Sequence, residues 1–308
     1  MKKIVLLMGG ETEREVSLMS ADEMLKAIDA SLYSVTAIDV KPNDGGKWVR
    51  QLMDEKPDTA MLALHGGIGE NGAVQGLLEC LSIPYVGSGV LSSALCMDKS
   101  LSKFILRANH IPVADDIFLA HGEDPYERIS DIVRLGFPLV VKPNGGGSSV
   151  GVSIARDLES LVEAVYEADE DGGGVLIEKF VKGTEITCSV IETPKGPEVL
   201  SVLDITADGA FYDYEAKYIS DLTNIKQSEL PPYQQSMTEE IAVQSFTALR
   251  CGGYARVDMI VFEEQVTVLE VNTLPGMTSH SLFPKAAAYA GLTFQQLIQK
   301  LLDNAKIK

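Results

Sequence analysis

The sequence predicts an α/β protein with a parallel-sheet N-terminal domain and a C-terminal part of the α+β type. Short apolar strands alternate with helical segments up to about residue 97, a rhythm typical of parallel sheets. From about Thr184 the apolar segments are longer and follow one another as strands, which favours an α+β arrangement. Hydrophobic residues make up 45% of the 308 residues, so disorder and coiled coil are excluded as overall descriptions.

In residues 1–97, the expected N-terminal domain, apolar runs alternate with segments of helical spacing. Lys3–Met8 is a short apolar strand that ends at two glycines, and Ser17–Ala30 has apolar residues at the spacing of one helical face. The other elements expected here are strands at Val35–Val40, Ala60–Leu64 and Ile83–Val86 and a helix at Ala73–Leu81.

Two further units follow without a low-complexity linker, so we expect the domains to pack tightly. For residues 98–183 the sequence predicts helices at Lys99–Asn109, Pro125–Gly136 and Leu158–Ala168. It predicts strands at Asp116–Ala120, Phe137–Lys142, Val152–Ala155 and Val175–Phe180. For residues 184–308 it predicts strands at Glu185–Glu192, Glu198–Ile205, Tyr254–Phe262 and Val266–Asn272, then helices at Ser281–Ala290 and Phe294–Asn304.

The charge and the apolar segments exclude several functions. A net charge of −18, from 44 acidic and 26 basic residues, argues against a general binder of nucleic acid or of anionic membrane surfaces. The N-terminal apolar run Ile4–Met8 is shorter than the roughly 7–15 residues of a signal peptide. No stretch approaches the roughly 20 apolar residues that span a bilayer. We expect a cytoplasmic protein whose cysteines are reduced, since no C-x-x-C pair occurs among Cys80, Cys96, Cys188 and Cys251.

A predicted hairpin in the third unit carries the most informative pattern. If its three-residue turn is centred on Glu264, Asp258 lies opposite Glu270. By the same symmetry Arg256 lies opposite Asn272, and alternation along the strands puts all four side chains on one face. Two opposed carboxylates repel each other unless a cation lies between them. Two carboxylates and an amide oxygen are hard ligands that suit Mg²⁺ rather than zinc.

The two faces of this hairpin are expected to differ. Core residues should fill the opposite face, namely Val257, Met259, Leu269 and Val271. The alternative for the polar face is a solvated surface with an Arg–carboxylate pair. Ile260 and Val268 are expected to continue the polar face, and apolar residues there indicate that it is covered.

A glycine-rich segment, Lys142–Gly151, directly follows an apolar strand and is a candidate phosphate loop. Glycines let backbone amides approach phosphate oxygens, serines add donors, and Lys142 adds positive charge. It is not a P-loop, because Val152 stands where the obligatory lysine would be. A flexible surface turn is the alternative.

A second loop, Gly67–Gly72, fits the G-x-G-x-x-G fingerprint between a strand and a helix, so dinucleotide binding must be weighed. The loop follows the third strand rather than the first, and Glu70 would lie beside a pyrophosphate, which argues against that function. His65 ends a parallel strand, where open α/β sheets place their ligands, and is expected to be functional. A lone acidic residue at a helix start, such as Glu15, usually complements the helix dipole.

Two further segments stand out near the C-terminal hairpin. Ala207–Leu230 is expected to be a long irregular stretch, and its three tyrosines between Phe211 and Tyr218 favour a lid that packs over a ligand. Asn272–Ser281 leads from the predicted metal face into a helix N-terminus, which can receive a carboxylate through free amides.

As a set, these residues resemble the D-alanine–D-alanine ligases, members of the ATP-grasp superfamily. The similarity runs essentially end to end, and the order and spacing of its motifs make it specific. The matching motifs are Glu13–Ser17, His65-Gly66, Gly87–Gly89, Met97–Lys99, Lys142-Pro143, Gly147–Gly151, Ile177–Lys179, Tyr212–Tyr218, Ala255–Asp258 and Glu270–Thr278. The resemblance implies a three-domain ATP-grasp fold, with ATP between the central (98–183) and C-terminal (184–308) domains and D-alanine facing them from the N-terminal one.

The resemblance also implies the reaction. ATP would phosphorylate the carboxylate of one D-alanine, and the amine of a second D-alanine would attack the acyl phosphate and expel phosphate. Mg²⁺, for which Mn²⁺ may substitute, would bridge the phosphates. The dipeptide would serve peptidoglycan precursor synthesis, cell-wall biogenesis and cell shape, and the enzyme would be a homodimer.

Site residues follow by the same resemblance. Those implied to bind ATP surround its phosphates, ribose and base: Lys99, Lys142, Ser148, Glu178, Lys179, Val181, Glu185 and Lys217. Those implied to bind the metal are the oxygen donors of the hairpin: Asp258, Glu270 and Asn272. Glu15 and His65 are implied to bind the first D-alanine, and Ser281 and Leu282 the second. Arg256 is also implied to bind substrate. Those implied to act in catalysis are Glu15, Ser148, Tyr218, Arg256 and Gly276.

Within that set, Arg256 and the amide of Gly276 would form an oxyanion hole. Ser148 and Tyr218 would link the lid to Glu15 and exclude water. Relatives that form depsipeptides lack the tyrosine at this place, so Tyr218 implies an amide product.

Two departures from the family pattern are small. Asn144–Gly147 replaces a bulkier, charged stretch, which implies a more mobile loop, and Asn224–Ser228 lacks a proline common in the family. The alternatives are another ATP-grasp amino-acid, dipeptide or depsipeptide ligase, a catalytically dead nucleotide-binding regulator, and an NAD-dependent dehydrogenase. The intact polar face of the hairpin argues against the dead version.

Overall fold

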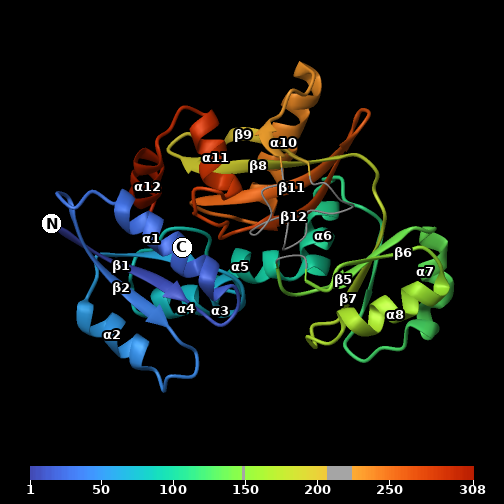
Figure 1. Cartoon of the computed structure of the whole chain (residues 1–308), viewed down its shortest axis with the longest axis horizontal. Helices are drawn as coiled ribbons and strands as arrows, with labels where there is room; N and C mark the ends of the chain where they lie inside the picture. The colour runs from blue at the N-terminus through green and yellow to red at the C-terminus, as the bar shows by residue number, and fades with distance from the viewer. Residues whose placement is uncertain (148–149, 207–223) are drawn as a thin grey trace.

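A computed structural model describes residues 1–147, 150–206 and 224–308. Its strands form three sheets, one in each third of the chain (Figure 1). The parallel sheet and the central sheet lie at opposite ends of the molecule, and the C-terminal sheet lies between and above them in this view. The predicted mixture of a parallel N-terminal sheet with longer antiparallel strands later in the chain is confirmed.

The N-terminal sheet has the order β2-β1-β3, and both of its strand pairs are parallel. Its strands are β1 (Lys2–Gly9), β2 (Tyr33–Val40) and β3 (Thr59–Leu64), and the helices around them are α1 (Arg14–Ala27), α2 (Lys47–Glu55), α3 (Gly67–Glu70) and α4 (Ala73–Cys80). Helices cover both faces of such a sheet, which explains why its inner strands are continuous apolar runs. Helices α2 and α3 are not among the predicted elements, and α3 occupies the start of the predicted loop Gly67–Gly72.

The strand predicted at Ile83–Val86 is wrong. Tyr85 makes only isolated bridges, one to Ala60 and one to Lys306. The preceding residue, Pro84, accepts a hydrogen bond from the Ala60 amide but has no N–H to donate to a neighbour. A proline at this place limits the pairing with Ala60 to an isolated bridge.

The central unit is an antiparallel sheet of order β4-β7-β5-β6. Helices α5 (Val90–Met97), which was not predicted, and α6 (Lys99–Ala108) lead into it. Its strands and covering helices are β4 (Asp116–Leu119), β5 (Leu139–Pro143), β6 (Ser153–Ala155), β7 (Val175–Lys179), α7 (Ile129–Leu135) and α8 (Leu158–Ala168). The single helix predicted at Pro125–Gly136 is instead a 3₁₀ turn, Pro125–Arg128, followed by α7.

The C-terminal sheet is antiparallel with the order β10-β9-β8-β11-β12. Its elements are β8 (Thr184–Thr193), β9 (Gly196–Thr206), β10 (Asn224–Gln227), α10 (Pro232–Ala248), β11 (Tyr254–Phe262), β12 (Gln265–Asn272), α11 (Leu282–Tyr289) and α12 (Phe294–Asp303). Strand β10 lies within the stretch predicted to be irregular, and α10 was not predicted. Strand β10 is a short, largely polar edge strand that pairs through its backbone with β9, so it shows no apolar alternation.

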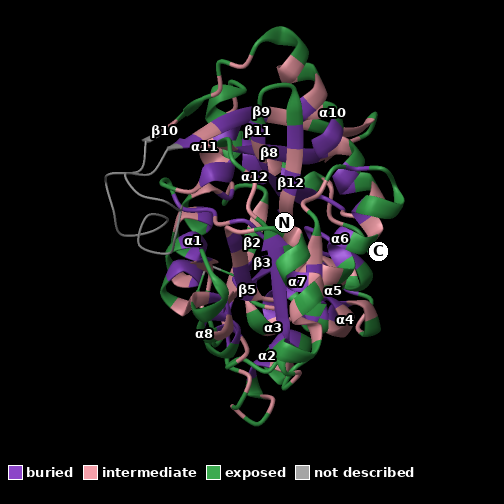
Figure 2. Ribbon diagram, turned by 90° about the vertical axis from the view of Figure 1, so that its right-hand side faces the viewer, coloured by how far each residue is buried: buried purple, intermediate pink, exposed green. Residues whose placement is uncertain are grey.

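The first and last parts of the chain share one hydrophobic core. Phe283 of α11 and Leu297 and Leu301 of α12 are fully buried with the apolar residues of β1 and β3. Figure 2 shows buried residues along the sheets and exposed ones on the outer turns of the helices. The prediction that the domains pack tightly fits this shared core. The boundaries at residues 97 and 183 stay predictions.

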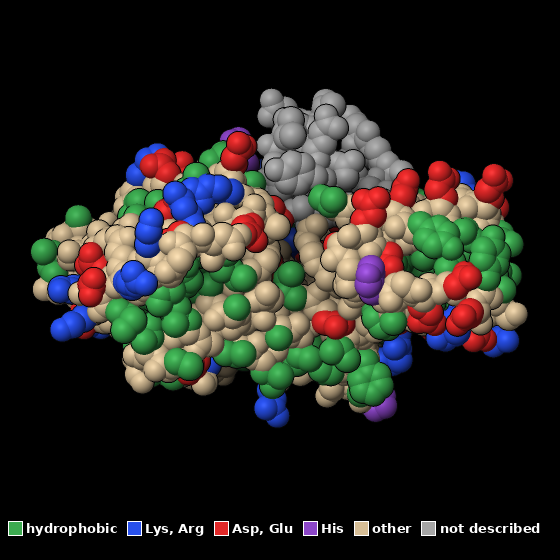
Figure 3. All heavy atoms as spheres, turned by 90° about the horizontal axis from the view of Figure 1, so that it is seen from below, with side chains coloured by type: hydrophobic (Ala, Val, Ile, Leu, Met, Phe, Trp, Pro, Cys, Tyr) green, Lys and Arg blue, Asp and Glu red, His purple; other side chains and the backbone are tan. Residues whose placement is uncertain are grey.

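Charged side chains lie mainly on the outside. Figure 3 shows acidic side chains gathered on one outer face, over the end of the molecule that the central unit forms. Among the residues that the structure describes, no helix combines the length and the apolar character needed to cross a membrane.

Candidate active site

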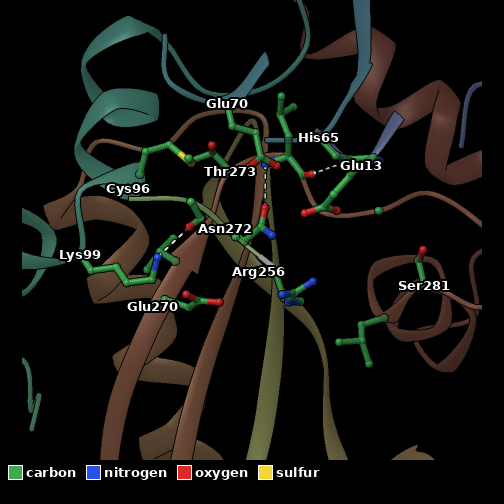
Figure 4. Close-up of a pocket in the computed structure, with 17 residues that line it drawn as sticks. Glu13, His65, Glu70, Cys96, Lys99, Arg256, Glu270, Asn272, Thr273 and Ser281 are labelled. Atoms are coloured by element: carbon green, nitrogen blue, oxygen red, sulfur yellow. Dashed lines mark hydrogen bonds between the residues drawn. The ribbon is translucent and has the colours of Figure 1, made fainter. Parts of the chain in front are cut away.

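A pocket lies where the three units meet, lined by residues from all of them (Figure 4). The N-terminal unit contributes Glu13, His65, Glu70, Cys96 and Met97, and the central unit contributes Lys99, Gly146 and Gly147. The C-terminal unit contributes Arg256, Glu270, Val271, Asn272, Thr273, Leu274, Gly276, Ser281 and Leu282. The structure thus brings together eight residues that the sequence marked as functional: His65, Lys99, Arg256, Glu270, Asn272, Gly276, Ser281 and Leu282.

The register of the β11–β12 hairpin puts the predicted polar residues opposite one another. Asp258 pairs with Glu270, and Arg256 pairs with Asn272. Figure 4 shows Arg256, Glu270 and Asn272 projecting from these strands into the same pocket. The predicted pairing at the site is confirmed.

The predicted turn of that hairpin is wrong, however. Phe262 pairs with Gln265, so the turn has two residues instead of three, and Met259 pairs with Val268. A bulge between the Asp258 and Met259 pairs leaves Leu269 as an extra residue of β12, and this restores the predicted register at the site. The faces change accordingly: Val268, not Leu269, is buried in the core beside Met259, and Val268 does not continue the polar face.

Arg256 and Asp258 form a buried, forked ion pair. The Nε and one terminal nitrogen of Arg256 donate to the two oxygens of Asp258 at 2.9 and 2.8 Å. Both residues are less than a tenth exposed. The Thr187 hydroxyl, on β8 directly beside Asp258, donates to Oδ1 at 2.6 Å. The solvated alternative for this face is therefore wrong, although its Arg–carboxylate pair is present.

The donor set of this face suits Mg²⁺. Among the described residues no group of three or more His, Cys, Asp and Glu could hold a metal ion. Mg²⁺ is ordinarily held by one or two carboxylates together with substrate phosphates and water, so a cluster of three is not needed. Asn272 Oδ1 accepts one hydrogen bond, from the Leu274 amide at 3.0 Å, and an amide oxygen has a second lone pair. The residues present fit the ion that the sequence predicts.

Lys142 and Glu178 are ion-paired on the central sheet, with 2.7 Å between Lys142 Nζ and Glu178 Oε2. Neither lines the pocket. Burial favours the neutral acid, but Lys142 and Lys103 outweigh it and hold the pKa of Glu178 below its ordinary value. Lys103, which was not among the predicted site residues, is buried and pairs with both Glu178 and Asp116. Its spacing of four from Lys99 on a basic helix is the only signal that marks it.

The glycine-rich loop is fastened to the start of α6. Lys99 Nζ donates to the Gly146 carbonyl at 2.7 Å, and the Lys99 amide donates to the Asn144 carbonyl. Asp98 caps the helix by accepting from the Leu101 amide. These contacts hold Gly146 and Gly147 in the lining of the pocket. The role of the loop in binding phosphate stays a prediction.

Glu13, and not the predicted Glu15, lines the pocket. Glu13 precedes α1 in the left-handed conformation, with φ of 48°, and it lines the pocket. A Cβ atom built on Gly147 would lie 3.5 Å from Glu13 Oε1, so this carboxylate faces the glycine-rich loop. Glu15 is exposed and does not line the pocket, because residues two apart on a helix point in different directions. Position in the motif Glu13–Ser17 could not distinguish the two acids without this geometry.

Glu70 is buried in the pocket wall, where the protonated form of its carboxyl group is favoured at neutral pH. Burial is the main cause, the neighbouring Glu13 adds to it, and together they raise the pKa of Glu70 to about 8. A protonated Glu70 can lie near Glu13 without repulsion between like charges. The segment Gly67–Gly72, which begins with α3, thus supplies a buried acid to the pocket wall.

The segment after β12 folds back tightly before α11. The Thr278 amide donates to Ser281 Oγ at 3.1 Å, and the two hydroxyls of Thr278 and Ser281 lie 2.8 Å apart. A Cβ atom on Gly276 would lie 2.7 Å from Ser281 Oγ, so a side chain at this position would force the Ser281 hydroxyl to move. The Gly276 backbone and the first residue of α11, Leu282, both line the pocket.

Two family descriptions match the chain: D-ala D-ala ligase C-terminus over residues 105–303 and D-ala D-ala ligase N-terminus over residues 49–88. The first match alone spans more than half of the 308 residues. The chain belongs to the D-alanine–D-alanine ligase family. The resemblance and the enzyme class predicted from the sequence, an ATP-dependent ligase, are thereby confirmed, and the NAD-dependent dehydrogenase is excluded.

Known members of the ligase family match over nearly the whole chain. D-alanine--D-alanine ligase A of Bacillus cereus is 41% identical over 305 residues, covering 98% of this chain and 97% of that protein. A solved ligase from Bacillus anthracis, complexed with ATP, superposes with a TM-score of 0.86 at 38% identity, covering 99% and 97% of the two chains. The VanG D-Ala:D-Ser ligase of Enterococcus faecalis superposes with a TM-score of 0.83 at 28% identity, covering 98% of each. The predicted three-part ATP-grasp fold is confirmed by these ligases.

The remaining predicted residues of this ligase lie elsewhere. Asp258 is buried and does not line the pocket, and Lys179 is exposed at the end of β7. Val181 and Glu185 are partly buried near the start of β8 and do not line the pocket. Three predicted residues, Ser148, Lys217 and Tyr218, lie outside the described residues, as does the tyrosine-rich segment 211–218.

Proposed function

We propose that the protein ligates two D-alanines to D-alanyl-D-alanine, with ATP as co-substrate and Mg²⁺ as cofactor, through an acyl phosphate. The observation that carries this proposal is the pairing of Asp258 with Glu270, and of Arg256 with Asn272, in a chain of this family. Of these four residues, Arg256, Glu270 and Asn272 line one pocket. The ATP that the Bacillus anthracis ligase holds supports the choice of nucleotide. Another ATP-grasp amino-acid or depsipeptide ligase is the alternative, since the D-Ala:D-Ser ligase shares the fold at lower identity.

Asp258, Glu270 and Asn272 would hold Mg²⁺, which when bound supplies positive charge to the oxygens of the transferring phosphoryl group. Glu270 and Asn272 line the pocket. Asp258 Oδ1 already accepts hydrogen bonds from Arg256 and Thr187, whereas Oδ2 accepts one, from Arg256. A carboxylate oxygen has two lone pairs, so Oδ2 can take a ligand while Arg256 stays in place.

Arg256 and the Gly276 amide would stabilise the oxyanion of the tetrahedral intermediate. Both line the pocket, and the ion pair with Asp258 fixes the guanidinium before substrate arrives. The start of α11, with Ser281 and Leu282, would receive the carboxylate of the second D-alanine through backbone amides and the helix dipole.

At the nucleotide end, Lys99 and Lys142 would neutralise phosphate oxygens, and Glu178 would hold the adenine. Lys142 now pairs with Glu178, so it would exchange that partner for a phosphate when ATP binds. Lys103 would keep Glu178 ionised after the exchange, because it contacts the other carboxylate oxygen. Lys179, Val181 and Glu185 would complete the nucleotide site.

Ser148, Lys217 and Tyr218 would close a lid over the site and favour an amide product. We propose domain boundaries at residues 97 and 183, which fall between the three sheets. We also propose a cytoplasmic homodimer that serves peptidoglycan precursor synthesis, in keeping with the family.

Glu13, and not Glu15, would hold the ammonium group of the first D-alanine. We expect Glu13→Gln to raise KM for D-alanine about 10- to 100-fold, the usual effect of losing a charged hydrogen-bond partner. Glu15→Gln is the matched control, because Glu15 is two residues away and exposed, and its KM should change less than about twofold. Steady-state kinetics with D-alanine as the varied substrate measure both. A larger effect of Glu15→Gln would assign the role to Glu15 instead.

One assay tests the proposed function as a whole. ADP and phosphate release would be measured with D-alanine, L-alanine, D-lactate or no acceptor, each with and without Mg²⁺. We expect release only with D-alanine and Mg²⁺ together. Release that does not depend on D-alanine would overturn the proposal, and no release under any condition would indicate a nucleotide-binding regulator.

A further inference from the structure

A buried set of hydrogen bonds joins the N-terminal unit to the loop that follows β12. His65 Nδ1 lies 3.1 Å from the Leu274 carbonyl oxygen, and His65 Nε2 lies 3.1 Å from Ser20 Oγ. Ser20 Oγ also accepts a hydrogen bond from the Met277 amide at 3.2 Å. Ser20 is fully buried on α1, and His65 is 5% exposed at the end of β3.

The chemistry of these partners fixes the hydrogens. A carbonyl oxygen only accepts, so Nδ1 must carry the hydrogen that the Leu274 carbonyl receives. Burial lowers the pKa of His65 below its ordinary value, so the ring is neutral and Nε2 has no hydrogen. The Ser20 hydroxyl then donates to Nε2 while its oxygen accepts from Met277. Each of the three groups has one role in a single, consistent network.

The network holds both ends of one short segment. Leu274 and Met277 flank Gly276, which lines the pocket and whose amide belongs to the proposed oxyanion hole. At its Leu274 end the segment is also held within the C-terminal unit, by the hydrogen bond from the Leu274 amide to Asn272 Oδ1. The backbone of His65 is itself fixed by the Thr12 hydroxyl, which donates to its carbonyl at 3.1 Å. The N-terminal unit therefore determines where this segment lies.

We propose that Ser20 and His65 are positioning residues that dock residues 274–277 onto the N-terminal unit and thereby place the Gly276 amide. The resemblance to the ligases implies instead that His65 contacts the first substrate. Both ring nitrogens are occupied within the protein, so a contact with a substrate carboxylate would break one of these hydrogen bonds. The effect on catalysis rests on the proposed function, whereas the docking itself does not.

The first test needs no substitution. In the ¹⁵N-labelled protein at neutral pH, we expect His65 to be the neutral Nδ1–H tautomer, with the nitrogen shift of Nε2 typical of an acceptor. The loss of its signals in His65→Asn would assign them among the four histidines. An Nε2–H tautomer or a charged ring would overturn the proposal.

The second test compares two buried serines of α1. Ser20→Ala removes the bridge to Met277, whereas Ser17→Ala removes hydrogen bonds to β1 and β3 only. We expect the Met277 amide to exchange its hydrogen at least about tenfold faster in Ser20→Ala, the effect of losing one buried hydrogen bond. The rate in Ser17→Ala should follow only its global stability. Equal Met277 exchange in the two variants, at equal stability, would contradict the docking.

The effect of the docking on catalysis is measured separately, by steady-state kinetics. We expect Ser20→Ala to lower kcat about tenfold while KM for ATP stays unchanged, because the misplaced amide acts only in the transition state. Ser17→Ala should keep kcat within about twofold. If the protein had no ligase activity, the proposed function would fail while the tautomer and exchange measurements still decided the docking. Normal kcat with fast Met277 exchange would show that the dock does not place the catalytic amide.

Discussion

Replacing Arg256 with methionine is expected to lower kcat about 10²- to 10³-fold, the usual result of removing one donor from an oxyanion hole. The guanidinium lines the pocket and is held rigidly by Asp258 through two hydrogen bonds. The same change leaves the Asp258 carboxylate buried without its cation, and we expect a loss of about 3–5 kcal/mol in the free energy of unfolding. Single-turnover kinetics and urea unfolding measure the two effects.

Arg256→Lys separates charge from geometry. Lysine keeps the positive charge but cannot form the fork that spans both oxygens of Asp258. We therefore expect a smaller loss of stability than in Arg256→Met, and a kcat that stays well below that of the unchanged protein. A lysine variant with full activity would show that Arg256 acts through charge alone, and a methionine variant with full activity would remove it from the mechanism.

Replacing Glu270 with glutamine is expected to lower activity about 10²- to 10³-fold at a fixed Mg²⁺ concentration, because several kcal/mol of charge stabilisation depend on the metal. Glutamine keeps the size and one oxygen of the side chain but removes the negative charge opposite Asp258. The free energy of unfolding should rise or stay the same, since two opposed carboxylates repel each other in the absence of the cation.

A Mg²⁺ titration distinguishes a ligand from a bystander. In Glu270→Gln we expect the Mg²⁺ concentration for half-maximal activity to increase at least about tenfold. Glu264→Gln is the matched control, because Glu264 is an exposed residue of the turn at the far end of the same hairpin. An unchanged Mg²⁺ requirement in Glu270→Gln would exclude Glu270 from the metal site.

Part of the β11–β12 hairpin could be predicted from its local sequence pattern, and part could not. Alternation along two strands was enough to place Asp258 against Glu270, because side-chain direction in a strand depends only on the backbone. The turn and the bulge were not predictable, because a two-residue turn with an extra residue in β12 gives the same register at the site as a three-residue turn. Only the burial of Val268 in place of Leu269 tells the two arrangements apart.

The sequence also could not show which of Glu13 and Glu15 faces the pocket. Both acids belong to one matched motif, and either could start a helix near the first substrate site. Their side chains diverge because Glu13 has a left-handed backbone conformation before α1, whereas Glu15 lies inside the helix. Ser20 left no signal at all, since a serine on an amphipathic helix has no feature that marks a partner 257 residues away.

By itself the sequence determined the class of fold, the family and the polar face of the hairpin, because strand alternation, glycine-rich loops and ordered motifs are local properties of the chain. Only the tertiary structure decided which acid faces the pocket, what His65 and Ser20 hold, and how Lys142 and Glu178 pair. These are contacts between segments far apart in the chain. Their partners are chosen by the packing of three sheets around one pocket, and no short window of sequence contains both sides of such a contact.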